Sequence, residues 1–156
     1  MADEQLSLQD VRDQIDDVKI AMLTTMDVTG RLRARPLTVQ DIDDEGHVVF
    51  VVDSGAEWVM SGARAANVSL TDDDVWVSIS GTLTISESAE LLDELWDEAT
   101  AAWFENGKAD AVVAHLAADV WEYWTAPNKL VQAFQIGKAV VTDDTPDAGG
   151  RGTIDV

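Results

Sequence analysis

Three arginines alternate with other residues in one short stretch of the chain. Arg31, Arg33 and Arg35 are two positions apart, and side chains two positions apart on a β-strand point to the same face. Like charges on one face repel one another unless something anionic lies between them. A guanidinium group is a planar donor that suits phosphate and carboxylate. Two interpretations are open: pairing with neighbouring aspartates, or a binding site for a phosphate or carboxylate ligand.

The residues that follow Arg35 add to this pattern. Pro36 fixes its own backbone and donates no hydrogen bond, so it indicates an outermost strand or an interruption of a strand, often beside a ligand. Residues 50–59 run from an apolar stretch through a glycine-containing turn toward an expected helix, and the free N–H groups of such a helix can bind phosphate. Asp53 and Glu57 would repel a phosphate there, which favours an ordinary strand–helix junction.

Tryptophan is abundant, with six residues in the chain. Trp121, Tyr123 and Trp124 lie together near the end of an expected strand. They could form a core or dimer contact, or they could form a flat apolar wall for an aromatic ring system.

The chain lacks the residues or spacings that cysteine chemistry, metal sites and serine hydrolases require. The chain has no cysteine, which excludes disulfides, thiolate catalysis and cysteine metal ligands. His47 and His115 are far apart and have no ligand-like spacing around them. No serine lies in a nucleophile-elbow motif. We therefore expect neither a metal site nor a Ser-His-Asp hydrolase.

The charge balance argues against whole classes of partner. Ten Lys plus Arg against 30 Asp plus Glu among 156 residues give a formal net charge of −20, which argues against binding to nucleic acid or to an anionic membrane. No apolar run reaches the roughly 18–20 residues of a membrane span, and the acidic N-terminus lacks the features of a signal peptide. We predict a cytoplasmic protein. The acidic surface is interpreted as a solvated one or, alternatively, as adaptation to a concentrated salt, halophilic cytoplasm.

Hydrophobic periodicity predicts the elements that position these residues. Ser7 begins a helix with an apolar stripe, and later helices are expected from Asp53 to about Ala66 and from Ser88 to about Trp103. Residues 130–141 are ambiguous, and we favour a helix there. Strands are expected at 20–26, 31–40, 47–52, 67–71, 75–85 and 112–124.

Strands joined by short turns favour an antiparallel β-barrel with helices packed outside it over a doubly wound parallel sheet. We predict a single domain over residues 1–145. The Gly-rich segment from Asp143, and residues 146–156 in particular, is predicted to be a flexible C-terminal tail.

Several stretches together resemble a known family. The ordered set extends from about residue 7 to 145, and it resembles the pyridoxamine 5′-phosphate oxidase-like FMN-binding split barrels, specifically the general stress protein branch. The stretches that carry the resemblance are 21–25, 30–37, 48–51, 67–70, 77–83, 95–96, 103–107, 122–124 and 138–142.

The resemblance implies a mainly β fold, a six-stranded antiparallel split barrel that forms a homodimer. FMN would lie in two clefts at the dimer interface. The arginine of the strand that faces the flavin and its phosphate corresponds to Arg35, and Trp124 corresponds to an aromatic residue from the partner chain. The cofactor-binding residues implied in this way are Arg35, Pro36, Leu37, Val51, Val52, Asp53, Trp58 and Trp124.

The phosphate-binding turn departs from the family pattern. Val52 and Ala56 stand where the family has hydroxyl side chains, and Glu57 and Trp58 stand where it has cations. Each lost charge-assisted bond to phosphate would be worth about 1.5–3 kcal/mol. Tight FMN binding in the usual pose therefore does not follow from the resemblance.

Two kinds of function remain open. The first is a flavin-binding protein with a redox or general stress role, in which Arg35 neutralises ligand charge and Trp58 and Trp124 flank the ring. Such a protein could be a flavin-dependent oxidoreductase, although oxidation of pyridoxamine phosphate is not expected. The alternative is a cofactor-free or altered-ligand module on the same dimeric barrel, for a deazaflavin or another flat ligand, with Trp58 filling the vacated phosphate position. A purely structural dimer is a third, weaker hypothesis.

Overall fold

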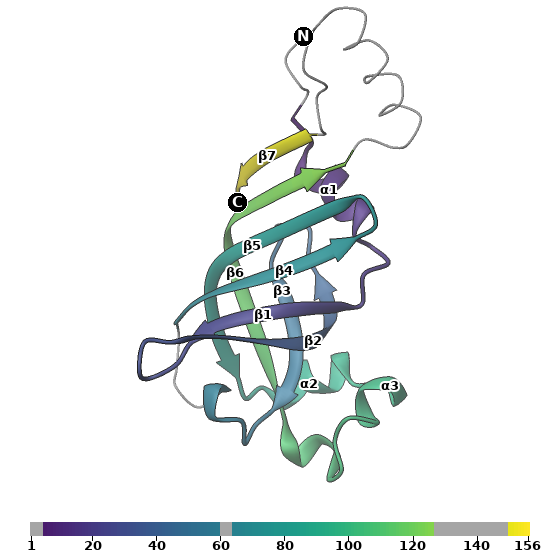
Figure 1. Ribbon diagram of the computed structural model, residues 1–156. Helices are drawn as coiled ribbons and strands as arrows, with labels where there is room; N and C mark the ends of the chain where they lie inside the picture. The colour runs from purple at the N-terminus through teal and green to yellow at the C-terminus, as the bar shows by residue number, and fades with distance from the viewer. Residues whose placement is uncertain (1–4, 60–63, 127–149) are drawn as a thin grey trace, which may run out of the picture.

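Six antiparallel strands close into a barrel in the computed structural model, which describes residues 5–59, 64–126 and 150–156 (Figure 1). The strand order is β3-β2-β1-β4-β5-β6, and β3 pairs with β6 to close the ring. This confirms the predicted six-stranded antiparallel split barrel. The strands are β1 Ile20–Met26, β2 Leu32–Ile42, β3 Val48–Asp53, β4 Arg64–Asp72, β5 Val75–Ser86 and β6 Ala111–Thr125.

Alternation of side chains along the strands fills the barrel. Val75, Val77 and Ile79 of β5 are buried while their neighbours face outward, as the period of two in a strand requires. Trp121 of β6 is completely buried, and its Nε1 donates to the carbonyl oxygen of Gly46 at 2.9 Å. Burying this indole without a partner would be costly, so the hydrogen bond fixes the β2–β3 turn against the core.

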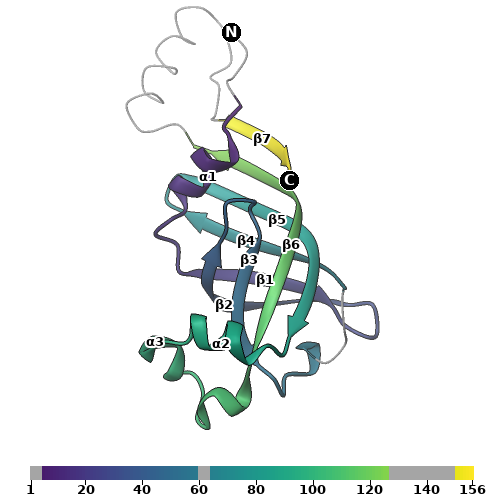
Figure 2. The same cartoon turned by 180° about the vertical axis from the view of Figure 1, so that it is seen from behind.

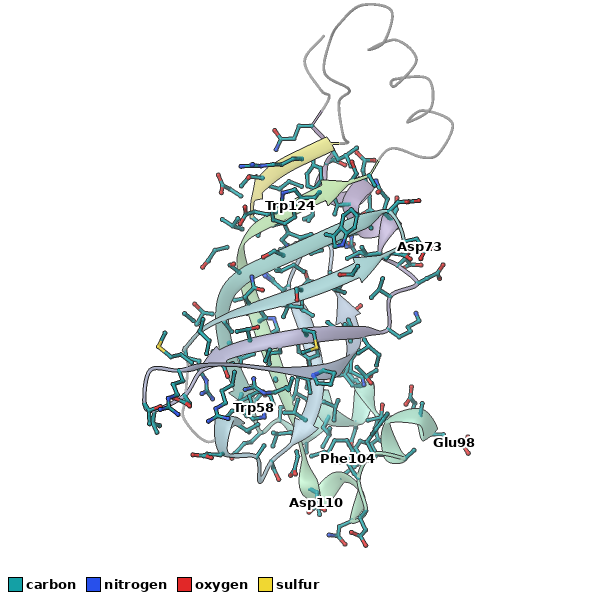
Figure 3. All side chains as sticks on the ribbon, in the orientation of Figure 1. Trp58, Asp73, Glu98, Phe104, Asp110 and Trp124 are labelled. Carbon is teal, nitrogen blue, oxygen red and sulfur yellow. The ribbon has the colours of Figure 1, made fainter. Side chains whose placement is uncertain are left out.

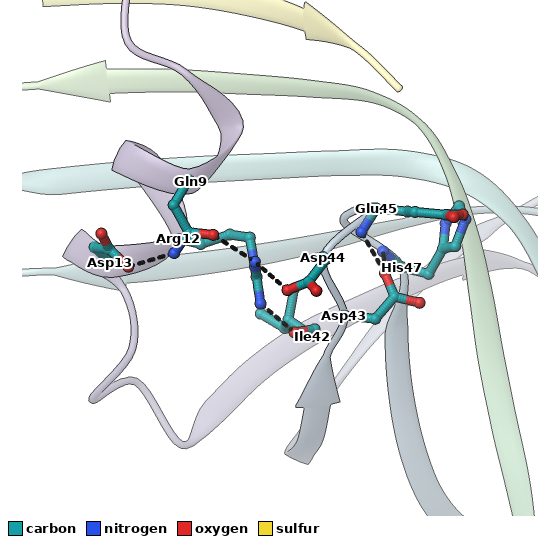
Figure 4. A network of polar contacts seen from close by, with 8 residues as sticks. All are labelled: Gln9, Arg12, Asp13, Ile42, Asp43, Asp44, Glu45 and His47. Atoms are coloured by element: carbon teal, nitrogen blue, oxygen red, sulfur yellow. Dashed lines mark hydrogen bonds and ion pairs between the residues drawn. The ribbon is translucent and has the colours of Figure 1, made fainter.

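Helix α1 (Leu8–Gln14) packs onto the same core. The helix begins after Ser7, as predicted, with a capping box in which the Ser7 side chain accepts from the Asp10 backbone and the Asp10 carboxylate accepts from Ser7. Arg12 then joins the helix to the β2–β3 turn, because it donates to the Ile42 carbonyl oxygen at 2.8 Å and pairs with Asp44 at 3.1 Å (Figure 4).

Strand β6 has two partners on one side. Its residues 111–116 pair with β3, and residues 120–125 pair with β7 (Gly150–Asp155). Against β5 the register shifts, since Ser80 lies opposite Val120 whereas Gly81 lies opposite Ala118. The extra residue of this bulge bends β6 from one partner toward the other.

Gly81 makes this bulge possible. A Cβ at position 81 would lie 2.0 Å from the carbonyl oxygen of Ala117, whereas a Cβ at Gly55 would meet nothing closer than 3.4 Å. Gly81→Ala is therefore expected to lower the free energy of unfolding by about 1–3 kcal/mol or more, measured by urea unfolding with tryptophan fluorescence. Gly55→Ala is the control and should leave stability almost unchanged; equal stability of the two variants would contradict the close approach at the bulge.

The helix expected from Asp53 to Ala66 was wrong for the residues that the structure describes. A turn follows β3, in which the Asp53 carboxylate accepts from the Gly55 backbone, and only a short 3-10 turn, η1 (Glu57–Val59), follows it. Strand β4 already begins at Arg64, earlier than predicted. Its pairing with both β1 and β5 outweighs the helix propensity of the alanine-rich sequence.

The single helix expected from Ser88 to Trp103 is divided in the structure. Helix α2 (Ala89–Leu95) ends at Trp96, which has an extended backbone, and Asp97 caps a second helix, α3 (Glu98–Ala101). The Asp97 side chain accepts from the backbone of Thr100 at 2.7 Å, so it restarts the helix in a new direction. This segment and the turn η2 (Gly107–Asp110) lie outside the barrel at its lower end (Figure 2).

The prediction of a flexible tail was wrong for residues 150–155, which form β7. The glycines that suggested flexibility allow close packing instead. A Cβ at Gly152 would lie 2.3 Å from the Tyr123 ring, and the backbone of Gly150 donates to Thr125 Oγ1 at 3.0 Å. The helix favoured for residues 130–141 lies outside the described residues.

Candidate functional site

A pocket of about 690 Å³ opens beside the β1–β2 hairpin. The hairpin from Thr25 to Arg35 forms one wall, and Glu57, Trp58 and Arg64 form the other. Four of the six arginines of the chain line this pocket, and they are Arg31, Arg33, Arg35 and Arg64. In a protein with a net charge of −20, such a concentration of cations marks the pocket as a place for an anion.

The hairpin turn holds the arginines in place. The Asp27 carboxylate accepts from the Thr29 hydroxyl at 2.6 Å, from the Thr29 backbone at 2.9 Å and from the Arg31 backbone at 3.0 Å. Beyond the turn, Arg33 and Arg35 share a face of β2 with Leu37, which packs against the main core. The inward face of β2 therefore changes from apolar to cationic where the strand leaves the core.

Arg35 is half-buried and lies against an aromatic ring. Its guanidinium carbon is 4.7 Å from the centre of the Trp58 ring, and its Nη1 donates to the Leu23 carbonyl oxygen at 3.4 Å. Burial, together with the positive charges of Arg64 and Arg33, lowers the pKa of Arg35. Among the described residues Arg35 forms no ion pair.

Arg33 differs from Arg35, because it has a carboxylate partner. Its Nε lies 3.1 Å from Asp27 Oδ2. Hydrogen bonds from the Thr29 side chain and the Arg31 backbone, with a smaller contribution from Arg33, hold the pKa of Asp27 well below its usual range. Pairing with a neighbouring aspartate, one of the two interpretations of the three arginines, thus applies to Arg33.

Arg64 is the site residue that sequence reasoning missed. It was placed in an expected helix, whereas it lies on β4 with the same inward alternation as Ala66 and Val68. Its Nε and Nη2 are buried and have no hydrogen-bond partner in the described part of the chain. Burial lowers its pKa. Reading residues 64–70 as a strand would have found it, because the alternation then puts Arg64 at the open end of an otherwise apolar face.

The structure brings two of the expected site residues, Arg35 and Trp58, together in the pocket. Pro36 is exposed on the outer face of β2, and Leu37 points into the core. Neither lines the pocket of this chain.

The expected residues of β3 also lie elsewhere. Val52 is buried in the main core, and Val51 faces the second apolar cluster beneath α2. Asp53 is exposed at the end of the strand. None of the three lines the pocket of this chain.

Trp124 lies far from Trp58, near the opposite end of the barrel (Figure 3). It pairs across the sheet with Trp76, whereas Arg64 of the pocket pairs with Leu83. These two positions on β5 are seven residues apart, about 23 Å at the usual rise of a strand. One chain therefore does not bring Trp124 to a ligand in its own pocket.

The arrangement suits recognition of an anion attached to a flat group. Arg35 and Arg64 offer guanidinium groups that pair with no carboxylate in the described part of the chain, and Trp58 offers an aromatic face. The described residues contain no cluster of three or more His, Cys, Asp or Glu side chains placed to hold a metal ion. Within the same residues, no helix has the length and hydropathy that crossing a membrane would require.

Several solved structures are similar to this chain. A chain assigned to general stress protein 26 from Jannaschia sp. CCS1 is 28% identical, with 96% of this chain and 100% of that chain covered and a TM-score of 0.74. A general stress FMN/FAD binding protein from Xanthomonas citri is 26% identical, with 75% of this chain and 87% of that chain covered and a TM-score of 0.65. A pyridoxamine 5′-phosphate oxidase-related, FMN binding protein from Nostoc punctiforme is 9% identical, with 99% and 98% covered and a TM-score of 0.61, and shows likeness of fold alone.

The sequence itself gives the family. No curated protein matches the sequence of this chain. The sequence profile described as pyridoxamine 5′-phosphate oxidase like matches residues 7–147. This match covers most of the chain, including the whole barrel and the hairpin that carries the arginines, so the chain belongs to the pyridoxamine 5′-phosphate oxidase-like family.

Proposed function

We propose that this protein binds FMN in the cationic pocket, between two copies of the chain, and serves a redox or general stress role in the cytoplasm. The observation that carries the proposal is the gathering of four of six arginines around one pocket in a strongly acidic chain. The volume of about 690 Å³ lies in the range of small-molecule sites, which is about 300–1,000 Å³. The Xanthomonas citri relative, an FMN/FAD binding protein, supports the choice of a flavin.

The residues of the pocket fit the two ends of this ligand. Arg35, with the cationic side of the pocket, would bind the phosphate, and Trp58 would lie against an aromatic ring. Bound flavin would supply hydride or electron transfer, while the protein binds and orients it. The acidic exterior would repel other anions from most of the surface and leave the pocket as the place of approach.

A second copy of the chain would complete the site. Trp124 is 37% exposed and lies on the outer face of the sheet with Trp76, which is 43% exposed. Met22 of β1 is also exposed, and its pairing with Ser69 puts it on this outer face. A two-fold dimer formed through this face could bring Trp124 of one chain to the pocket of the other, and it would cover apolar surface that a monomer leaves in water.

A specific observation favours the second candidate, an altered-ligand module. Glu57 lines the pocket with its acidic side chain, and the Trp58 ring already covers one side of Arg35. A ligand with a flat ring but a different anionic group, such as a deazaflavin, would use the same arginines.

The absorption spectrum of the purified protein and a titration with FMN test the proposal. We expect either a yellow protein with the bands of oxidised flavin, or a colourless one whose tryptophan fluorescence is quenched by added FMN, since Trp58 lines the pocket. A colourless protein that does not respond to FMN would contradict the proposal. If such a protein responds to a deazaflavin, the altered-ligand module is the correct function.

A further inference from the structure

We propose that Arg64 and Arg35 together hold the phosphate of the ligand, so that strand β4 supplies a cation that the turn after β3 lacks. This inference rests on the flavin site proposed above and adds a residue and a ligand preference to it. The turn and η1, residues 53–59, contain no lysine or arginine and carry two acidic side chains. Arg64 is the next cation along the chain, and it lines the same pocket.

The burial of Arg64 points to a missing partner. Two of its donor atoms, Nε and Nη2, are shielded from solvent and have no hydrogen-bond partner among the residues that the structure describes. A buried donor without an acceptor is costly, and more so when it is charged. An anion in the pocket would satisfy both donors once the Arg64 side chain turns toward it, because Nε and Nη2 of one guanidinium form the fork that binds two phosphate oxygens.

Arg35 and Arg64 approach the pocket from the two strands that flank β1. Leu23 of β1 pairs with Arg35 on one side, and β1 pairs with β4 on the other. The charge of Arg64 contributes to the lowered pKa of Arg35, so the two guanidinium groups interact across the pocket. Because no carboxylate pairs with either in the described ranges, their repulsion favours an anion between them.

The charges of the pocket favour a phosphomonoester. Four arginines and two carboxylates, Asp27 and Glu57, line it, which leaves a surplus of two positive charges. A phosphomonoester carries about −1.5 to −2 at pH 7 and offers three acceptor oxygens. The pocket should therefore prefer FMN to riboflavin, which has the same ring and no phosphate.

Titration calorimetry of FMN and riboflavin against matched variants tests the inference. Arg64→Gln is expected to weaken FMN binding by about 10- to 100-fold, which is the effect of losing a charge-assisted contact, and to leave riboflavin binding unchanged. Arg64→Lys keeps the charge but loses the fork, so an intermediate loss is expected. Lys19→Gln removes one positive charge from an exposed position outside the pocket and should change FMN binding by less than about threefold.

These measurements distinguish a direct contact between Arg64 and the phosphate from a loss of folded protein and from a general loss of positive charge. The ratio of the two affinities within one variant does not depend on the fraction of protein that is folded. An unchanged ratio in Arg64→Gln, or an equal loss in Lys19→Gln, would overturn the role of Arg64 and leave the flavin site standing. Wild-type protein that binds neither FMN nor riboflavin would overturn the proposed function, and this inference with it.

Discussion

Arg35→Ala is expected to lower the affinity for FMN by at least about 25-fold. The substitution removes a charge-assisted contact to phosphate, worth about 1.5–3 kcal/mol, and it removes the cation–π contact that holds Trp58, worth about 0.5–2 kcal/mol. A loss of 1.4 kcal/mol corresponds to about tenfold in affinity. Because Arg35 is half-buried and its guanidinium group lies 4.7 Å from the Trp58 ring centre, its removal also takes away one contact of the aromatic wall of the pocket.

Quenching of tryptophan fluorescence by FMN measures this effect. Lys19→Ala is the control. This substitution also removes one positive charge, but Lys19 is exposed and lies outside the cationic pocket. We expect it to bind FMN as the wild type does. An affinity of Arg35→Ala within about threefold of the wild type would remove Arg35 from the site.

Mixing two defective variants is expected to restore FMN binding. If Trp124 serves the pocket of the partner chain, Trp124→Ala and Arg35→Ala homodimers each carry two damaged sites. A mixed dimer carries one site with both defects and one with neither. After random exchange of subunits about half of the dimers are mixed, so about a quarter of all sites should bind FMN with wild-type affinity.

The stoichiometry of tight binding after joint refolding measures this restoration. A mixture of Arg35→Ala with Arg64→Gln is the control: both substitutions damage the pocket of their own chain, so no combination yields an intact site. Wild-type affinity in the Trp124→Ala homodimer, or no tight binding in its mixture with Arg35→Ala, would show that the site is not shared between chains. Neither result would by itself exclude flavin binding within one chain.

Strand positions were predictable from sequence where tertiary pairing and local preference agree. Residues 20–26 are apolar, rich in threonine and without a helical period, and they predicted β1 with the bounds that the structure gives. The alanine-rich residues before Asn67 favour a helix on propensity, yet they pair with two neighbouring strands. Pairing between distant segments is not visible in a local pattern, and Arg64 was missed for this reason.

The site was predictable only in part, and strand geometry explains which of the expected residues line the pocket and which do not. Arg35, Pro36 and Leu37 were expected to share a ligand, but successive residues of a strand point to opposite faces. Of these three, Arg35 lines the pocket, while Leu37 packs with the core. Trp58 was placed through its match to the family's phosphate-binding turn, whereas a contribution from Trp124 depends on a second chain and not on any pattern within one.

The short strand β7 has a consequence for solubility. Residues 120–125 of β6 would otherwise present a row of unpaired N–H and C=O groups, because β3 covers only residues 111–116. Such an open edge is a template on which other chains can add strands and aggregate. Strand β7 covers this edge with glycine-rich residues that fit closely over Tyr123. The edge that β7 presents in turn is short and carries Arg151 and Asp155, and short, charged edges discourage the addition of further strands.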